Sequence, residues 1–331
     1  MEVKKKLKKV LIIKLGAIGD VIHSTMLAQS IKRANPDCIV HFMTSDFITP
    51  LLENNPDIDK VIWFTGHRRN DYPYLIFKGL SLMFQRYDAV FPLSNSIRNY
   101  IMMFFMFPKQ IIKRNKKRVH AVDCFYNTAV DNFGEIEKPK SLRIFVKDEL
   151  KSEIKERFKD YPRPWIIFSP GGANDLDRQG RIWVDDYWKE LGNSIIDEYG
   201  GTIFVCGSNK ETELHKQYKE IKNSVILTGK MELIESTALY SLCDLFISGD
   251  SGPLHIASAL DIKVLAILGS MPEYIVRPYC LQSYVAEPNT ECKACGDKVC
   301  KLLKEGEKFT PCMKSIHACD ILNLIRDNKL L

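Results

Sequence analysis

The stretch KVLIIKLGAIGDVIHSTMLAQSIK, residues 9–32, changes from the pattern of a β-strand to that of a helix within a few residues. The apolar run Val10–Leu15 predicts a buried strand, and the amphipathic run Val21–Arg33 predicts a helix. The turn between them reads GAIGD, residues 16–20. It is open to three interpretations: a nucleotide-binding turn, a turn that carries a catalytic acid, or a helix cap.

The same alternation of strand and helix patterns continues along the chain. In the first half, further strand patterns occupy Ile39–Thr44, Val61–Phe64, Ala89–Leu93 and Leu142–Val146. In the second half they occupy Trp165–Ser169, Thr202–Cys206, Ser224–Leu227, Leu245–Ser248 and Val264–Leu268. Strands that alternate with helices at this spacing predict βαβ units and parallel sheets, and therefore the α/β class.

Two doubly wound domains are predicted, residues 1–150 and 151–331. The joint lies near residues 148–164, where DELKSEIKERFKDYPRP reads as a charged helix followed by two prolines. Parallel strands of open sheets bind ligands at their carboxyl ends. We therefore expect the two domains to face each other across a central cleft that holds the site. The sequence leaves open that the last helix of the second domain packs back on the first domain.

Composition limits the functional classes. The 331 residues are 45% hydrophobic and 27% charged, as in a globular protein, and the net charge of +6 suits an anionic partner. We expect no nucleic-acid partner. No signal-peptide pattern precedes the first strand, so a cytoplasmic location is expected.

One apolar stretch is ambiguous. YIMMFFMFP, residues 100–108, is too short to span a membrane, and the basic run KRNKKR, residues 113–118, follows it. A buried helix is the favoured interpretation. The alternative is an apolar surface beside a basic patch that meets anionic lipid.

The stretch ISGDSGPLHIASAL, residues 247–260, is a second strand–turn–helix unit. Its glycines allow close approach of a ligand to the backbone, and Pro253 suits the first turn of a helix. The free N–H groups of a helix start favour a phosphate. We prefer a phosphate site here to a capped turn without a ligand.

Other turns at predicted strand ends carry candidate ligand contacts. Arg178 and Arg181 lie in the loop of FSPGGANDLDRQGRIWVDDYW, residues 168–188, where an Arg can pair with a diphosphate. Glu211, in FVCGSNKETE, is a candidate for a ribose or base edge, and Met231, beside Lys230 in TGKMELIES, for packing on a base. The alternatives are a first-turn Glu that complements the helix dipole and a Met that fills space.

The cysteine-rich tail gives an intermediate signal. Cys292, Cys295, Cys300, Cys312 and Cys319 begin with a CxxC but lack a second one and paired histidines. Structural zinc or iron at the first four is one interpretation. Reduced thiols are the favoured one, as expected for a cytoplasmic chain.

Taken together, these motifs resemble glycosyltransferase family 9, the ADP-heptose:lipopolysaccharide heptosyltransferases. The resemblance rests on VLIIKLGAIGDVIHSTMLAQSIKRANP, FSPGGAN with RIWVDDYWKEL, GKMELIESTALYSLCDLFISGDSGPLHIASAL and VLAILGSMPE, in this order. It implies a GT-B fold of two Rossmann-like domains, with the acceptor on the first and the nucleotide sugar on the second. It also implies inverting transfer without a metal or other required cofactor, from an ADP-heptose-type donor to an anionic, lipid-linked core sugar.

The resemblance assigns roles residue by residue. Asp20 matches the general base, and Arg181 stands where the family usually has a phosphate-binding Lys. The nucleotide-sugar contacts implied or suggested on the second domain are Arg181, Glu211, Lys230, Met231, Asp250, Ser251, Gly252 and His255. On the acceptor side the candidates are Gly19, His23 and Arg98.

The residues alone leave alternatives open. Asp20 serves equally well as a helix cap or a base, and the resemblance favours the base. His23, three residues later, is interpreted first as a core-edge histidine. The same fold with a protein or another surface glycan as acceptor, a dinucleotide-dependent oxidoreductase, and a non-catalytic nucleotide-sugar binder are the competing functions. GAIGD lacks the first glycine of GxGxxG, which disfavours the oxidoreductase.

Overall fold

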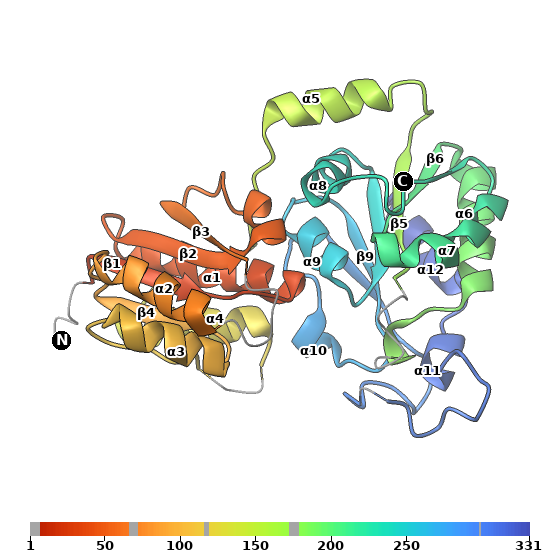
Figure 1. Cartoon of the computed structure of the whole chain (residues 1–331). Helices are drawn as coiled ribbons and strands as arrows, with labels where there is room; N and C mark the ends of the chain where they lie inside the picture. The colour runs from red at the N-terminus through yellow and green to blue at the C-terminus, as the bar shows by residue number, and fades with distance from the viewer. Residues whose placement is uncertain (1–6, 66–71, 116–118, 172–178, 298) are drawn as a thin grey trace. The chain divides into compact units, whose positions relative to one another are not determined.

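The computed structural model describes residues 7–65, 72–115, 119–171, 179–297 and 299–331. The chain forms two compact units, Met1–Phe145 (unit 1) and Val146–Leu331 (unit 2). Each unit contains one parallel sheet with helices packed on it (Figure 1). The predicted α/β class with parallel sheets is confirmed.

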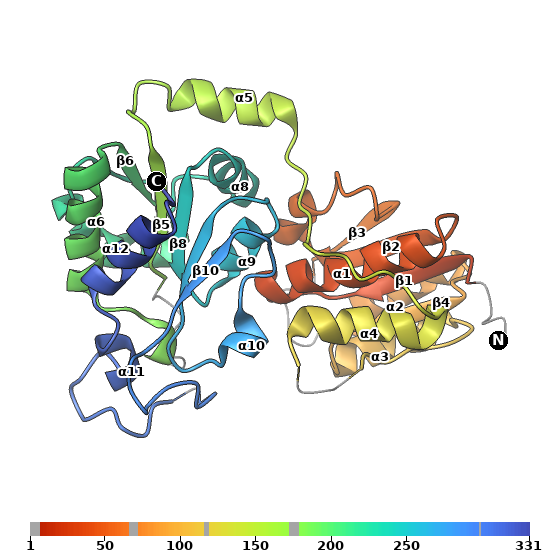
Figure 2. The ribbon, with the colours of Figure 1, turned by 180° about the vertical axis from the view of Figure 1, so that it is seen from behind.

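Unit 1 is built on a four-stranded sheet in the order β3-β2-β1-β4. Its strands are β1 (Lys9–Ile13), β2 (Ile39–Ser45), β3 (Lys60–Phe64) and β4 (Ala89–Pro92). Helices α1 (Ile18–Ala34) and α4 (Ala121–Phe133) pack together on one face (Figure 2), and α2 (Tyr72–Met83) and α3 (Ile97–Met106) cover the other (Figure 1). Because β1 is central and covered on both faces, its residues Val10–Ile13 are fully buried, as their continuous apolar run predicts.

Two stretches of unit 1 differ from expectation. The predicted strand Leu142–Val146 is wrong: the segment pairs with no strand, although Leu142, Ile144 and Val146 are buried in alternation. Alternating burial of this kind also occurs in an extended segment that packs on a core without a hydrogen-bonded neighbour. The stretch YIMMFFMFP lies mostly in α3, whose buried face contains Met102, Met103 and Met106 while other apolar side chains are exposed.

Unit 2 is built on a six-stranded sheet in the order β10-β9-β8-β5-β6-β7. The strands are β5 (Trp165–Ser169), β6 (Thr202–Val205), β7 (Ser224–Ile226), β8 (Leu245–Gly249), β9 (Val264–Ile267) and β10 (Ser283–Ala286). The helices are α5 (Asp148–Arg157), α6 (Asp185–Tyr199), α7 (Thr212–His215), α8 (Leu233–Ser241), α9 (Gly252–Ser258), α10 (Glu273–Val276), α11 (Pro311–Lys314) and α12 (Ala318–Asp327). The last helix, α12, packs on α6 and β10, and its Ile321 and Ile325 belong to the core of unit 2.

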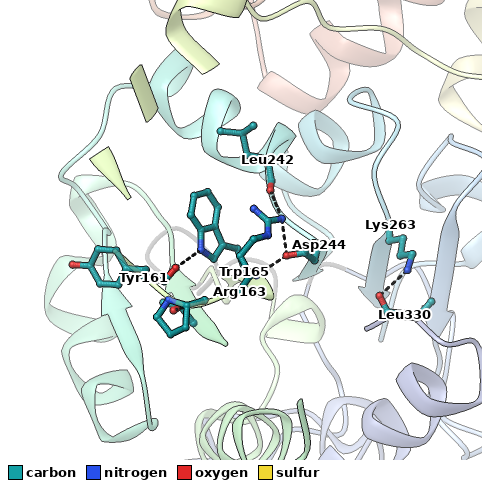
Figure 3. Close-up of polar contacts among 9 residues, drawn as sticks. Tyr161, Arg163, Trp165, Leu242, Asp244, Lys263 and Leu330 are labelled. Atoms are coloured by element: carbon teal, nitrogen blue, oxygen red, sulfur yellow. Dashed lines mark hydrogen bonds and ion pairs between the residues drawn. The ribbon is translucent and has the colours of Figure 1, made fainter. Parts of the chain in front are cut away.

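In unit 2, side-chain contacts connect the amino ends of the strands to neighbouring segments (Figure 3). Arg163 lies 2.7 Å from the Asp244 carboxylate, which also accepts a hydrogen bond from the backbone N–H of Trp165. This ties the start of β5 to the start of β8. Just before β9, Lys263 donates to the carbonyl of Leu330 at 2.9 Å and holds the end of the chain. Ligands bind in such sheets at the opposite edge, where the strands have their carboxyl ends.

Among the described residues, no helix is both long and apolar enough to cross a membrane.

Candidate active site

The turn after β1 presents a carboxylate held by a buried cation. Asp20 lies in the first turn of α1, and its Oδ2 accepts a hydrogen bond of 2.8 Å from Lys14 Nζ. The Lys14 side chain is only 8% exposed, whereas that of Asp20 is 52% exposed. The ammonium group therefore fixes the carboxylate from the protein side and leaves part of it accessible to a ligand.

The helix-cap interpretation of Asp20 is wrong. The N-cap of α1 is Ala17, whose side chain makes no capping bond, and Asp20 follows three residues later. A negative charge in the first turn still complements the helix dipole. Its side-chain partner, however, is Lys14, a residue that sequence reasoning missed. The signal was present as the single charge that ends the apolar run VLII.

The predicted acceptor-side residues occupy different environments. Gly19 is buried in the first turn of α1. His23 is also buried, on the same helix, and its ring meets that of His120 edge-on at 5.5 Å. Arg98 is half-buried in the first turn of α3. Because β4 and β1 are parallel neighbours, Arg98 and Asp20 both follow strands that end at the same edge of the sheet.

In unit 2 the structure brings Arg181, Asp250 and His255 together at the end of β8. Arg181 Nη2 lies 2.9 Å from Asp250 Oδ2, and His255 Nε2 lies 3.6 Å from Asp250 Oδ1. The Asp250 side chain is 6% exposed and that of Arg181 is 20% exposed. The N–H groups of Arg181 are not aligned on Oδ2, so this buried oxygen accepts no hydrogen bond within the described residues. A buried acceptor of this kind is rare and suits a ligand that donates to it.

Close packing fixes Arg181 against the strand. A Cβ atom added to Gly249, the last residue of β8, would lie 2.8 Å from the carbonyl oxygen of Arg181. Only a glycine therefore lets the short helix η3 (Gln179–Arg181) approach the end of β8 so closely. The predicted Arg178 lies outside the described residues.

The turn that precedes α9 is capped. Ser251 is the N-cap, and its hydroxyl accepts a hydrogen bond from the N–H of Leu254 at 3.3 Å and contacts Ser248 Oγ at 2.9 Å. Gly252 begins the helix and Pro253 occupies its first turn, as predicted. The cap uses the serine hydroxyl.

The turns after β6 and β7 lie side by side. The N–H of Gly229 donates to the carbonyl of Gly207 and so joins the turn that precedes Glu211 to the turn that contains Lys230 and Met231. Glu211 Oε2 accepts from the N–H and hydroxyl of Ser208 and so caps the helix η4 (Asn209–Glu211), while Lys230 donates to the carbonyl of Ile226. Met231 is half-buried.

A buried histidine that sequence reasoning missed supports these turns. One ring nitrogen of His215 lies 2.8 Å from Thr228 Oγ1, and the other lies 3.1 Å from the carbonyl of Gly171. Burial lowers the pKa of His215 below its usual range, so the imidazole is held neutral as a bridge between the ends of β5 and β7. A single His in an amphipathic segment gives no sequence signal for this role.

The structure does not assemble the metal site considered for Cys292, Cys295, Cys300 and Cys312. No group of three or more His, Cys, Asp or Glu side chains among residues 179–297 and 299–331, or elsewhere in the described chain, is arranged to hold a metal ion. All ten cysteines are free thiols; Cys312 is buried, whereas Cys295 is exposed. Burial, with a lesser effect of neighbouring cysteines that include Cys300, raises the pKa of both Cys312 and Cys292.

Known proteins resemble this chain in sequence and in fold. The chain is 26% identical to lipopolysaccharide heptosyltransferase 2 of Salmonella typhimurium over 80% of this chain and 84% of that protein. The structure of Escherichia coli ADP-heptose LPS heptosyltransferase II has a TM-score of 0.79 at 21% identity, with 97% of this chain and 98% of that chain covered. A glycosyl transferase family 9 structure from Veillonella parvula has a TM-score of 0.82 at 20% identity, over 99% and 98%.

These two structures confirm the predicted GT-B fold of Rossmann-like domains. The model of glycosyltransferase family 9 (heptosyltransferase) matches residues 97–305, which is more than half of the 331 residues. The chain therefore belongs to glycosyltransferase family 9.

Proposed function

We propose that this glycosyltransferase moves a heptose from ADP-heptose to an inner-core sugar of lipopolysaccharide, with inversion and without a metal. The observation that carries the proposal is the similarity to lipopolysaccharide heptosyltransferase 2 over 84% of that protein's length. The first domain, residues 1–150, takes the acceptor, and the second, residues 151–331, takes the nucleotide sugar. The half-exposed Asp20 and the Arg181–Asp250–His255 cluster provide the two sets of groups that this chemistry requires.

Asp20 acts as the general base. Its carboxylate takes the proton of the acceptor hydroxyl while the hydroxyl oxygen forms a bond to the anomeric carbon of the heptose. The bond from that carbon to the ADP oxygen breaks on the opposite face, and ADP leaves with the bonding electrons. Lys14, at 2.8 Å, holds the carboxylate in one position, which is the positioning that a bimolecular transfer needs.

The donor side stabilises the leaving diphosphate. Arg181 supplies a positive charge, and the backbone at Ser251 and Gly252 supplies N–H groups at a helix start. These groups take the part that a divalent cation plays elsewhere. The buried Oδ2 of Asp250 accepts from a hydroxyl of the donor sugar, with His255 beside it. Glu211, Lys230 and Met231 line the turns proposed for the nucleoside.

The acceptor is anionic and lipid-linked, which agrees in sign with the net charge of +6. An enzyme that acts on such an acceptor works at the cytoplasmic face of the inner membrane. We therefore infer a peripheral visit to that membrane.

The test is mass spectrometry of the product formed from ADP-heptose and a water-soluble, deacylated inner-core acceptor. Asp20→Ala should lower kcat by about 10²–10⁴-fold, as for the loss of a general base, and leave ADP affinity within about threefold. Glu137→Gln, which removes a charge from a side chain that is 86% exposed in the same unit, is the matched control. Full activity of the Asp20 variant would remove Asp20 as the base. Thermal stabilisation by NAD alone, and by neither ADP-heptose nor ADP, would overturn the proposed donor.

A further inference from the structure

Helix α2 exposes apolar side chains on the face that points away from the sheet. Phe77, Leu80 and Phe84, the last just beyond the helix end, recur at the spacing of one helical face. They are 69%, 41% and 79% exposed. The opposite face of the helix, with Leu75 and Leu82, is buried on the sheet. A helix covering the surface of a globular protein normally carries polar residues on its outer side.

Helix α3 has the same arrangement. Ile97, Tyr100, Phe104 and Phe107 lie on its outer face at intervals of three or four residues. Their exposed fractions run from 37% for Tyr100 to 68% for Ile97 and Phe104. The sequence pattern could not separate the two faces of this helix, because both are apolar.

The two outer faces form one surface. Helices α2 and α3 lie side by side (Figure 1), so closely that a Cβ on Gly79 would lie 2.5 Å from the carbonyl oxygen of Met102. We call the surface the apolar face; it consists of Phe77, Leu80, Phe84, Ile97, Tyr100, Phe104 and Phe107. Contiguous apolar surfaces of this kind mark contacts with a membrane or a partner.

The charges around the apolar face are positive. Tyr72–Met83 and Ile97–Met106 contain Lys78 and Arg98 and no acidic residue. Arg86 follows α2 and Lys109 follows α3. The one acidic residue in the sequence between α2 and α3, Asp88, forms an ion pair with Lys109 at 2.5 Å. Apolar side chains on two helices that contain Lys and Arg but no acidic residue suit the interface of an anionic bilayer, where the aromatic rings enter the headgroup region and the cations meet the phosphates.

We propose that the apolar face docks on the surface of an anionic lipid bilayer. The proposal rests on the proposed function, since it explains how the enzyme meets a lipid-linked acceptor, and it locates the membrane contact on named residues. Ile97 begins α3 at the sheet edge where β1 and β4 end, which is also the edge that carries Asp20. Docking through this face therefore brings the acceptor-side edge of unit 1 to the lipid headgroups.

The experiment is co-sedimentation of the full chain with vesicles of phosphatidylcholine, with and without phosphatidylglycerol. Wild-type protein should bind the anionic vesicles, and binding should weaken as salt is raised. The variant Phe84→Ser/Phe104→Ser/Phe107→Ser should bind at least about tenfold more weakly, since it removes three rings from the headgroup region. The control is Tyr274→Ser/Leu281→Ser, which removes similarly exposed apolar side chains from unit 2 and should bind like wild type.

Three results would overturn the proposal: no binding of wild-type protein to anionic vesicles, equal binding of the triple variant, or equal losses in the triple and control variants. A stable dimer that the triple variant breaks, seen by analytical ultracentrifugation, would show that a second copy occupies the face instead. Transfer to the water-soluble acceptor is measured in parallel. The triple variant should keep that activity and its thermal stability, so a failure of docking and a failure of the proposed function give different results.

Discussion

Breaking the buried ion pair between Arg181 and Asp250 should destabilise unit 2. Their charged atoms are 2.9 Å apart, and the side chains are 20% and 6% exposed. At an effective dielectric constant of about 20, unit charges at that distance attract by roughly 6 kcal/mol before desolvation is subtracted. Removal of one partner leaves the other charge buried, which costs about 3–5 kcal/mol. Arg181→Met should lower the free energy of unfolding by an amount near the upper end of this range. Asp250→Asn should lower it by less, because the Arg181 guanidinium that it leaves unpaired reaches water more easily.

The exposed pair Arg163–Asp244 in the same unit is the matched control (Figure 3). Its atoms are 2.7 Å apart, but its side chains are 49% and 36% exposed. Exposed pairs are screened by water and couple by less than about 1 kcal/mol. The two pairs share the type of charges and nearly the same distance, and they differ in burial and in hydrogen bonding, since Asp244 accepts hydrogen bonds from Arg163 and from the N–H of Trp165.

A double-mutant cycle on each pair measures the difference. Urea unfolding of the single and double variants is followed by tryptophan fluorescence, since Trp165, Trp183 and Trp188 are all buried in unit 2. We expect a coupling free energy of about 2–3 kcal/mol for Arg181–Asp250 and below about 1 kcal/mol for the control. Equal coupling free energies in the two cycles would refute the reasoning, because burial would then not strengthen the attraction between Arg181 and Asp250.

Three further predictions follow from single contacts. Lys14→Met should lower kcat about tenfold without changing ADP affinity, because the Asp20 carboxylate loses its fixed position; steady-state kinetics with ADP calorimetry would contradict this if only ADP affinity fell. Gly249→Ala should weaken ADP binding about tenfold in calorimetry, since the new methyl group must displace the Arg181 backbone at 2.8 Å; unchanged affinity would argue against that constraint. Burial, with lesser effects of nearby lysines, lowers the pKa of His41 from 6.5 to about 4. The neutral ring thus contributes stability that is complete above pH 6.5 and is lost as pH falls toward 4, by at most about 1.4 kcal/mol per pH unit. His41→Gln should remove that loss in urea unfolding at pH 7 and pH 5, and an unchanged pH slope would assign it to other groups.

The core strands were predictable because burial on both faces leaves a continuous apolar run. Val10–Leu15 and the observed β1 (Lys9–Ile13) differ only at their ends. Leu142–Val146 shows the limit of the same signal. An alternating apolar pattern reports which side chains are buried, but it does not report whether a neighbouring strand is present to accept the hydrogen bonds.

The site was predictable where one turn contains the whole signal, as in Ser251–Pro253. It was not predictable where a role depends on a distant contact. Lys14 gains its role from Asp20, which lies six residues later on the next element of the fold. His215 gains its role from Thr228 and Gly171, which follow two strands far apart in sequence. From sequence, Glu211 fits both a ligand contact and a first-turn residue that complements the helix dipole, and its bond to Ser208 could not be read from either pattern.

At the amino edges of both sheets, an aspartate just before one strand accepts hydrogen bonds from the backbone at the start of the neighbouring strand. Asp59 accepts from the N–H of Val40, Asp88 from the N–H groups of Lys8 and Lys9, and Asp244 from that of Trp165. In each case the carboxylate pairs with the first residues of the neighbouring strand, where a parallel ladder leaves donors without partners. A hydrogen bond to a charged group contributes about 1.5–3 kcal/mol. These bonds stabilise the amino edges, whereas the carboxyl end of β8 carries Asp250, whose buried Oδ2 is ion-paired with Arg181 but accepts no hydrogen bond within the described residues.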